Sequence, residues 1–469
     1  PRTKIIATLG PASDSEEHVA DMIQNGVDAV RLNMSHGTLE EHVQHVERVR
    51  RHAAQGDRRV AVLMDLQGPR IRLGRFEEGE IRAEAGTQIR LIQQTRTSGG
   101  DGLPLPHPEV FAAVAAGHRL FLADGEIELR LQSADQDRIV AKVVSGGTLR
   151  SRQGINLPDT RLELPLLTDQ DLEHIGFAVK QKADYLALSF VRTADDVADL
   201  RAKVYRSGRE IPIVAKIERA EALDHLDAIL EAADGIMVAR GDLGVETSPA
   251  EVPILQKEII RRANRRAVPV ITATQMLESM MSRSRPTRAE ASDVANAILD
   301  GSDGLMLSGE TAVGAHPTKA IKAMIAIATK MEDHFPYLRG LRRLGEERAA
   351  GVTDAVSQAV CQMAHDLDAR AIITTTSSGH TARMVARHRP KTPILAVSSN
   401  PETCQRLALV WGVEAHAVPA FQDTDALIET SLRAAQEKGI VTDGDTVVIA
   451  AGVPHGEPGR TNMIKVHRV

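Results

Sequence analysis

Short apolar runs recur along the first two thirds of the chain, and segments of helical period fill most of the intervals between them. Unbroken runs of this length are typical of parallel strands that are buried on both faces. The eight expected strands span residues 5–9, 29–32, 60–64, 185–188, 213–217, 235–238, 268–272 and 304–307. With helices between them, for example over 221–232 and 287–299, they predict a closed (β/α)₈ barrel rather than an open doubly wound sheet.

The interval between the third and fourth strands is far longer than one helix can fill. Between residues 68 and 163 the pattern changes to alternating apolar and polar positions with turns, which predicts an inserted, small antiparallel β domain. Because it leaves and returns at the carboxyl end of the third strand, we expect it to act as a lid that excludes water. Gly68-Pro69 and Leu164-Pro165 mark the expected hinges.

A third α/β unit follows the barrel. The charged segment 339–350 is expected to be a linker with helical character, and strands are expected over 371–375, 394–397, 414–417, 446–450 and 463–466. The expected domains are therefore 1–67 with 164–342 for the barrel, 68–163 for the lid and 343–469 for an open, mostly parallel C-terminal domain.

Composition narrows the class of protein. Hydrophobic residues make up 42% of the 469 residues, and no apolar run approaches the roughly 20 residues that span a bilayer. A net charge of −6 and 2% aromatic residues argue against a nucleic-acid-binding protein. The two cysteines are too few for a disulfide scaffold, and no signal-peptide pattern is found, so we expect a cytoplasmic protein without membrane or nucleic-acid partners.

Polar residues follow nearly every expected barrel strand. In a barrel the carboxyl ends of the strands converge on one mouth, so side chains from distant parts of the sequence meet there. Each alone could be a helix cap or a satisfied core residue, but their repetition at the same strand end favours a site. They are Thr8, Arg31, Asn33, Ser35, Asp65, Ser189, Lys216, Glu218, Asp242, Thr272, Thr274, Ser308 and Glu310.

These groups suit phosphoryl transfer. Glu218 follows the fifth strand, and Asp242 follows the sixth in a glycine-rich stretch that is expected to be a turn with free backbone amides. Two carboxylates on neighbouring strands can hold one Mg²⁺, which takes few protein ligands. Arg31, Arg72 and Lys216 supply the positive charge that a transferring phosphoryl group needs. The chain has neither a Walker loop nor a protein-kinase glycine-rich loop.

The turn at 374–381 in the third unit combines hydroxyl groups, a glycine and the expected start of a helix over 382–388. This combination suits a phosphate group. An ordinary Ser/Thr helix cap is the alternative interpretation, and the pattern alone leaves both open.

At these residues the sequence resembles the pyruvate kinase family over essentially its whole length. The matching blocks span residues 3–13, 30–37, 213–218, 235–244, 273–279, 285–296 and 306–311. The resemblance implies a TIM (β/α)₈ barrel with an inserted small β-barrel lid and a C-terminal α/β regulatory domain. It also implies transfer of the phosphoryl group of phosphoenolpyruvate to ADP, giving pyruvate and ATP in the final step of glycolysis.

The resemblance assigns roles to individual residues. Glu218 and Asp242 would bind Mg²⁺ or Mn²⁺, Arg31 and Lys216 would contact the phosphoryl group, and Lys216 would stabilise the enolate. The further implied residues are Gly241, Asp242 and Thr274 for the substrate carboxylate; Asn33, His36, Arg72 and the lid residue Arg152 for the nucleotide; and Thr274 with Ser308 for a water-mediated proton route.

The sequence departs from the family pattern at Arg70, where many members have a glutamate. In the family, groups that match Asn33, Ser35, Asp65 and the Leu66 carbonyl coordinate K⁺. A fixed guanidinium at position 70 could take the place of that ion, so we expect activity that does not require K⁺.

The third unit resembles the family's effector domain. The effector turn is expected to comprise Thr376, Ser377, Ser378, Gly379, His380 and Thr381. The loop 452–462 lacks the basic residues that a bisphosphate would need, so we expect activation by a sugar monophosphate or by AMP, in a homotetramer. The alternatives are another Mg²⁺-dependent barrel enzyme that handles phosphoenolpyruvate or pyruvate, and a non-catalytic sensor on the same scaffold.

Overall fold

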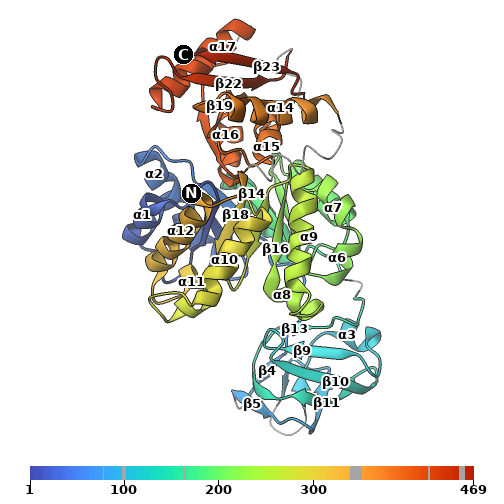
Figure 1. The fold of residues 1–469 in the computed structure, drawn as a ribbon. Coiled ribbons are helices and arrows are strands. Elements are labelled where there is room, and N and C mark those ends of the chain that lie inside the picture. The colour runs from blue at the N-terminus through green and yellow to red at the C-terminus, as the bar shows by residue number, and fades with distance from the viewer. Residues whose placement is uncertain (78, 98–101, 163, 338–350, 421–422, 454–459) are drawn as a thin grey trace.

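The computed structural model describes residues 1–469 apart from 78, 98–101, 163, 338–350, 421–422 and 454–459. Three parts lie along one long axis (Figure 1). The barrel lies in the middle, the inserted β domain lies at one end of it, and the C-terminal α/β unit lies at the other. None of the helices within the described residues has the length and apolar character needed to cross a membrane.

Eight parallel strands close into the barrel, as expected from the apolar runs. In the order of their pairing they are β1 (Lys4–Thr8), β18 (Gly304–Leu307), β17 (Val270–Ala273), β16 (Gly235–Ala239), β15 (Ile213–Ile217), β14 (Tyr185–Leu188), β3 (Ala61–Asp65) and β2 (Ala29–Asn33). The seventh strand begins two residues later than predicted, because Pro269 has no N–H group to donate to the sheet.

Helices surround these strands. They are α1 (Glu16–Asn25), α2 (Leu39–Gln55), α4 (Asp169–Lys180), α5 (Ala194–Arg206), α6 (Ala220–Asp224), α7 (Leu226–Ala232), α8 (Arg240–Glu246), α9 (Val252–Arg265), α10 (Arg288–Asp300), α11 (Gly309–Ala312) and α12 (Pro317–Asp333), with a 3₁₀ turn over Glu278–Met281. Capping boxes at Thr38, Thr168 and Thr287 begin three of them. The single helix predicted over 221–232 is divided at His225.

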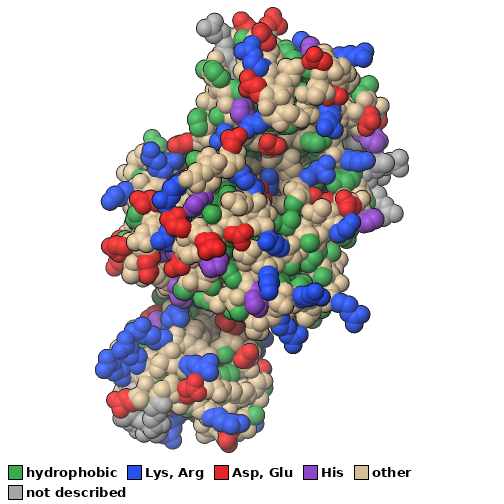
Figure 2. Space-filling view, turned by 90° about the vertical axis from the view of Figure 1, so that its left-hand side faces the viewer, with side chains coloured by type: hydrophobic (Ala, Val, Ile, Leu, Met, Phe, Trp, Pro, Cys, Tyr) green, Lys and Arg blue, Asp and Glu red, His purple; other side chains and the backbone are tan. Residues whose placement is uncertain are grey.

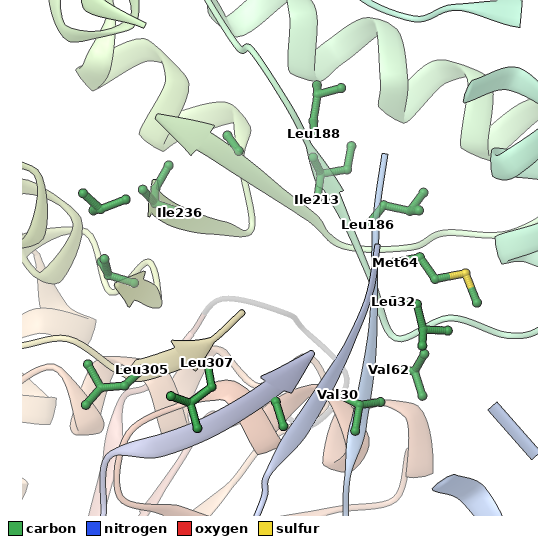
Figure 3. Close-up of a cluster of buried hydrophobic side chains, with 14 of the residues drawn as sticks. Val30, Leu32, Val62, Met64, Leu186, Leu188, Ile213, Ile236, Leu305 and Leu307 are labelled. Carbon is green, nitrogen blue, oxygen red and sulfur yellow. The ribbon is translucent and has the colours of Figure 1, made fainter. Parts of the chain in front are cut away.

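The barrel has an outer and an inner apolar layer. Side chains such as Leu32, Met64, Leu186 and Leu305 point away from the barrel axis (Figure 3) and belong to a core shared with the helices. The residues that alternate with these along the strands, such as Leu63, fill the inside of the barrel. This burial on both faces is why the strands have continuous apolar sequences.

The inserted domain has its own apolar core, which includes Leu91, Leu120, Leu129 and Ile139. Its elements are β4 (Arg75–Phe76), β5 (Glu80–Ala83), β6 (Gln88–Ile92), β7 (Arg96–Thr97), β8 (Leu103–Pro104), α3 (Pro108–Ala113), β9 (Arg119–Leu122), β10 (Ile127–Ala134), β11 (Arg138–Ser145), β12 (Gly147–Arg150) and β13 (Ile155–Asn156). The six-stranded sheet β13-β9-β10-β11-β6-β8 is mixed rather than purely antiparallel, because β6 and β8 pair in parallel. Its hydrogen bonding leaves β13 and β8 as the edges among the described residues, so the sheet is not closed into the expected small barrel.

The C-terminal unit is an open, mostly parallel sheet, as predicted. Its strands pair in the order β21 (Val413–Ala417), β20 (Ile394–Ser398), β19 (Ala371–Thr375), β22 (Thr446–Ala451) and β23 (Met463–Arg468), and only β23 is antiparallel. The helices are α14 (Val352–Asp366), α15 (His380–Ala386), α16 (Pro401–Arg406) and α17 (Thr424–Glu437). Helix α15 begins two residues earlier than predicted, and the linker expected over 339–350 lies outside the described residues.

A buried arginine joins the C-terminal unit to the barrel. Arg389 donates to both carboxylate oxygens of Asp303, at 3.0 and 3.1 Å. Its guanidinium lies 4.9 Å from the centre of the Trp411 ring, and the Trp411 backbone N–H donates to the same carboxylate. Because Asp303 precedes β18, this cluster fixes the C-terminal unit to the end of the barrel opposite the lid (Figure 1).

Candidate active site

A chain of alternating charges lies at the carboxyl ends of β2, β3 and β15. Arg31 Nε donates to Asp65 Oδ2 at 2.7 Å, and Lys216 Nζ lies 3.3 Å from Asp65 Oδ1. Lys216 Nζ also lies 2.8 Å from Glu218 Oε1 and donates to Ser189 Oγ at 2.8 Å. The structure therefore brings Arg31, Asp65, Lys216 and Glu218 together from three parts of the sequence, which the convergence of strand ends explains.

Burial and ion pairing act in opposite directions on these groups. Burial alone would raise the pKa of Asp65, but the charges of Lys216 and Arg31 outweigh it and hold that pKa below its usual value. Burial would lower the pKa of Lys216, yet the Asp65 and Glu218 carboxylates raise it. The pKa of Glu218 is raised, mainly by burial and with Lys216 opposing, and nearby Asp242 adds to the rise. The site thus keeps a charged lysine in a water-poor pocket.

Asp242 lies in the first turn of helix α8, not in the glycine-rich turn that the sequence suggested. Strands β15 and β16 pair in parallel, so Glu218 and Asp242 follow neighbouring strands as expected. Glu218 Oε2 accepts from the Phe190 backbone N–H at 2.8 Å, while its buried Oε1 lies 2.8 Å from the Lys216 ammonium group. Two carboxylates that lie close together, here Glu218 and Asp242, are the donor set that suits a hard divalent cation.

Gly241 and Thr274 meet across the site. The Gly241 backbone N–H donates to Thr274 Oγ1 at 2.9 Å, so this amide already has a partner. Thr274 and Gln275 both have positive φ angles, 67° and 53°. Arg240 supports this strained segment: its guanidinium donates to the Thr274 carbonyl at 2.8 Å and pairs with Asp293 at 2.7 Å. Asp293 is distant from Arg240 in the sequence, so no local sequence pattern indicates this pairing.

Ser308 has a buried hydroxyl without a hydrogen-bond partner among the described residues. Its backbone N–H donates to Glu310 Oε2 at 2.8 Å, and Glu310 Oε1 accepts from the Leu277 N–H. Glu310 therefore holds the backbone around the mouth. The expectation that Thr272 faces the mouth is wrong, because its hydroxyl is fully buried and bonds to Ser302.

Basic residues surround His36 on the side toward the lid. Asn33 Nδ2 lies 3.1 Å from His36 Nδ1. Burial lowers the pKa of His36, and the charges of Arg72, Arg70 and Arg31 lower it further. This places three arginines around one exposed imidazole, an arrangement with affinity for polyanions.

Arg72 and Arg152 lie together where the lid joins the barrel. Arg72 Nη1 donates to the Arg152 carbonyl at 3.0 Å, and Arg152 has a φ of 61°. The pKa of Arg72 is lowered by burial and by the charges of Arg70 and Arg152. Like-charged side chains held together in this way are typical of an anion site.

The expected monovalent-ion position is lined by internal hydrogen bonds. The Leu66 carbonyl accepts from Ser189 Oγ at 2.8 Å, and Asn33 Oδ1 accepts from the Ser35 N–H at 3.3 Å. The exposed Arg70 guanidinium lies 5.9 Å from the centre of the Phe190 ring, the residue that follows Ser189. Arg70 thus stays near this position without pairing with Asp65.

A cleft separates the lid from the barrel mouth, and the molecule narrows there in Figure 2. Its walls include Asp124 and Asn156 from the lid, and Asp242 and Glu246 from α8. Glu246 was not among the predicted site residues, although its position four residues after Asp242 places both on one helix face. Burial raises the pKa of Glu246, with Arg219 opposing.

The comparisons with known proteins agree with this geometry. The family model described as "Pyruvate kinase, barrel domain" matches residues 1–321, and the model "Pyruvate kinase, alpha/beta domain" matches residues 354–467. This chain belongs to the pyruvate kinase family. The pyruvate kinase of Geobacillus stearothermophilus is 44% identical over 469 residues, which cover 99% of this chain and 80% of the relative. The pyruvate kinase of Bacillus licheniformis is 41% identical over an alignment that covers 100% of this chain and 80% of the relative.

Membership in the pyruvate kinase family makes the chain a phosphotransferase and implies phosphoenolpyruvate, ADP and pyruvate as reactants. The family generally uses a divalent metal ion such as Mg²⁺. The Glu218 carboxylate and the neighbouring Asp242 carboxylate are the oxygen donors that such an ion requires.

The turn that is expected to bind an effector leads into helix α15. Ser377 and Ser378 are exposed, and Gly379 has a φ of 82° at the helix start. The Thr376 N–H donates to the Val397 carbonyl. Thr381 is buried, and its hydroxyl bonds to Thr461 at 2.9 Å. His380 is half-buried, and burial lowers its pKa. The two exposed serines therefore present their hydroxyl groups to solvent on this turn, whereas the Thr381 hydroxyl is paired.

Proposed function

We propose that the chain transfers the phosphoryl group of phosphoenolpyruvate to ADP, giving pyruvate and ATP in the last step of glycolysis. The buried series Arg31–Asp65–Lys216–Glu218, which ends beside Asp242, is the observation that carries this proposal. It presents two fixed cations and two carboxylates at one mouth, in a pocket where charge is weakly screened.

Lys216 and Arg31 bind and orient the phosphoryl group. Asp65 holds both cations in place, so little reorganisation is needed when negative charge spreads over the phosphoryl oxygens and the enolate. Thr274 and the backbone amides of Gly241 and Asp242 would bind the substrate carboxylate, with the Gly241 amide exchanging its present partner, Thr274 Oγ1. Asn33, His36, Arg72 and Arg152 would bind the phosphates of ADP.

Glu218 and Asp242 would hold Mg²⁺ or Mn²⁺, which when bound supplies Lewis-acid stabilisation of oxygen atoms that gain negative charge. Enolpyruvate must then gain a proton at carbon. Ser308 Oγ is buried and unpaired among the described residues, so it can order a water molecule on a route past Thr274. Water is the better acid, and the hydroxyls orient it.

One coupled assay tests the reaction: ATP and pyruvate are measured from phosphoenolpyruvate, ADP and Mg²⁺. Formation of both products supports the proposal. Another phosphoenolpyruvate-handling barrel enzyme would give pyruvate without ATP, and a sensor would give neither product while still binding ligand.

We also propose that this activity does not require K⁺. The support is the Arg70 guanidinium, which lies against Phe190 next to the monovalent-ion position. Replacing KCl by tetramethylammonium chloride should change turnover less than twofold, and Arg70→Glu should introduce K⁺ dependence. Loss of nearly all turnover in the parent protein without K⁺ would contradict this proposal.

Regulation is proposed to act through Ser377, Ser378 and the residues around them, in a cytoplasmic homotetramer. A hydroxyl-rich turn at a helix start suits the phosphate of a sugar monophosphate or AMP. Glucose 6-phosphate, ribose 5-phosphate and AMP should be titrated separately, and at least one should lower the half-saturating phosphoenolpyruvate concentration. Sedimentation equilibrium tests the tetramer, and a monomer would contradict it.

A further inference from the structure

Two extended segments, 71–73 and 153–155, lie side by side where the lid joins the barrel, and Arg72 lies in the first of them, in an isolated bridge to Gly154. The Leu73 N–H donates to the Gln153 carbonyl, and the Ile155 N–H donates to the Ile71 carbonyl, both at 2.9 Å. Arg72 and Gly154 are thus opposite each other as a pair without mutual hydrogen bonds. The Arg72 backbone N–H therefore points away from the second segment, and this pairing provides no acceptor for it.

His107 supplies that acceptor from the body of the lid. The Arg72 N–H donates to His107 Nε2 at 3.2 Å. Because a backbone N–H can only donate, Nε2 must be unprotonated, which leaves the proton of the neutral imidazole on Nδ1. Nδ1 lies 3.0 Å from Glu109 Oε1, so Glu109 accepts that proton's hydrogen bond and fixes the tautomer. His107 and Glu109 belong to the start of α3.

We propose that His107, oriented by Glu109, is a positioning residue that aims Arg72 at the phosphates of the nucleoside diphosphate. The inference rests on the function proposed above. Fixing the 71–72 peptide plane fixes the direction of the Arg72 side chain, whose Nη1 is held by the Arg152 carbonyl at 3.0 Å. Both ends of the residue are thereby restrained before any ligand binds, which reduces the entropy lost on binding.

Restraint matters here because the guanidinium groups repel one another. Arg72 lies close enough to Arg70 and Arg152 for their charges to act on it, and Asp124 is the acidic group that opposes them. Without the backbone tie, Arg72 can relax away from its like-charged neighbours toward solvent. The hydrogen bond that His107 accepts from the Arg72 backbone N–H holds the cluster in a geometry that an added polyanion can bind at once.

The test compares His107→Phe with His107→Gln. Phenylalanine keeps the ring but removes the acceptor, whereas the Gln amide oxygen can replace Nε2. His107→Phe should raise the KM for ADP roughly tenfold, the equivalent of one lost hydrogen bond, with kcat and the KM for phosphoenolpyruvate within about twofold of the parent. His107→Gln should restore most of the ADP affinity, and Glu109→Ala should give a smaller rise.

His118→Phe is the matched control. His118 is also a half-buried lid histidine, and its Nδ1 lies 2.9 Å from Thr160 Oγ1, but it has no bond to Arg72. If His118→Phe raises the KM for ADP as much as His107→Phe, general loosening of the lid explains the effect and the inference is wrong. An unchanged KM for ADP in His107→Phe, or failure of His107→Gln to restore it, also overturns it.

Hydrogen exchange and calorimetry separate this inference from the proposed function. In His107→Phe without ligand, the backbone amide hydrogens of residues 69–76 should exchange faster than in the parent protein. The Kd for ADP, measured by calorimetry, should rise by the same factor as the KM for ADP. If the parent protein shows no phosphoryl transfer, the proposed function fails, and these two measurements still decide the role of His107.

Discussion

Replacing Lys216 by methionine removes the cation that three neighbours share while keeping nearly the same side-chain length. The change leaves Asp65 with Arg31, at 2.7 Å, and leaves Glu218 with the Phe190 backbone N–H, at 2.8 Å. Ser189 Oγ loses the ammonium group that donates to it. The variant therefore tests both the chemistry and the stability of the buried charge series.

The stability cost follows from this arrangement. Removing one partner from a buried ion pair costs about 3–5 kcal/mol. The lower end applies, because each carboxylate keeps one favourable partner. A loss of about 3 kcal/mol corresponds to a decrease in Tm of about 6–12 °C for a unit of this size. Turnover should fall by at least ~10³-fold, since removing a single group that stabilises a developing oxyanion already costs ~10²–10³.

The assay measures the coupled formation of ATP and pyruvate, and calorimetry measures Tm on the same samples. Lys203→Met is the control: Lys203 forms a surface pair with Asp199, so its loss should change stability by less than about 0.5 kcal/mol. Turnover above one tenth of the parent value in Lys216→Met would refute the catalytic assignment. An unchanged Tm would show that the carboxylates do not depend on Lys216.

Three further predictions concern Ser308, His388 and Arg389. Ser308→Ala should change Tm by no more than about 1 °C, because the Ser308 hydroxyl has no hydrogen-bond partner among the described residues. The same variant should slow the protonation of enolpyruvate by about tenfold, measured in a solvent-isotope assay. An unchanged protonation rate would contradict this role. Burial, with Arg387, lowers the pKa of His388 to about 3. Protonation therefore favours the unfolded state as the pH falls below about 6.5, so stability should drop by about 2 kcal/mol at pH 5 relative to neutral pH; equal acid sensitivity in His388→Gln would contradict this. Arg389→Lys should lower the free energy of unfolding in urea by about 3 kcal/mol, because the variant loses the bidentate pairing with Asp303 and the contact with the Trp411 ring. Arg433→Lys on the surface is the control and should cost less than about 1 kcal/mol. A loss as small as this in Arg389→Lys would show that the cluster does not hold the two units together.

The barrel strands were predictable because burial on both faces produces a continuous apolar sequence. The run at 213–217 coincides with β15, whose residues are all buried. The run at 268–272 was displaced, because hydrophobicity does not register that Pro269 cannot donate a hydrogen bond. The strand pairing of the lid sheet was harder to predict, since alternation of apolar and polar residues does not show whether two strands pair in parallel.

The site was predictable only where strand ends impose it. Lys216 and Glu218 are two residues apart after one strand, so their proximity follows from the sequence. Thr272 and Arg240 were not predictable, because their partners, Ser302 and Asp293, are set by the packing of other elements. The contact of His107 was not predictable for the same reason, because no residue near it in the sequence indicates that it accepts a hydrogen bond from the Arg72 N–H.

Arg240 explains how the substrate side of the mouth keeps its shape. Thr274 and Gln275 have left-handed backbones, which cost of order 1–3 kcal/mol each for residues with side chains. Arg240 compensates by donating to the Thr274 carbonyl, while its pairing with Asp293 on α10 fixes the guanidinium. The Thr274 hydroxyl is consequently aimed at the Gly241 N–H, at the start of the helix that carries Asp242. A carboxylate that enters here meets an amide and a hydroxyl already set at hydrogen-bonding distance from each other. The rigid part of the site is therefore this backbone turn, whereas Arg72 and Arg152, which we propose to bind the nucleotide, belong to a lid that is positioned separately.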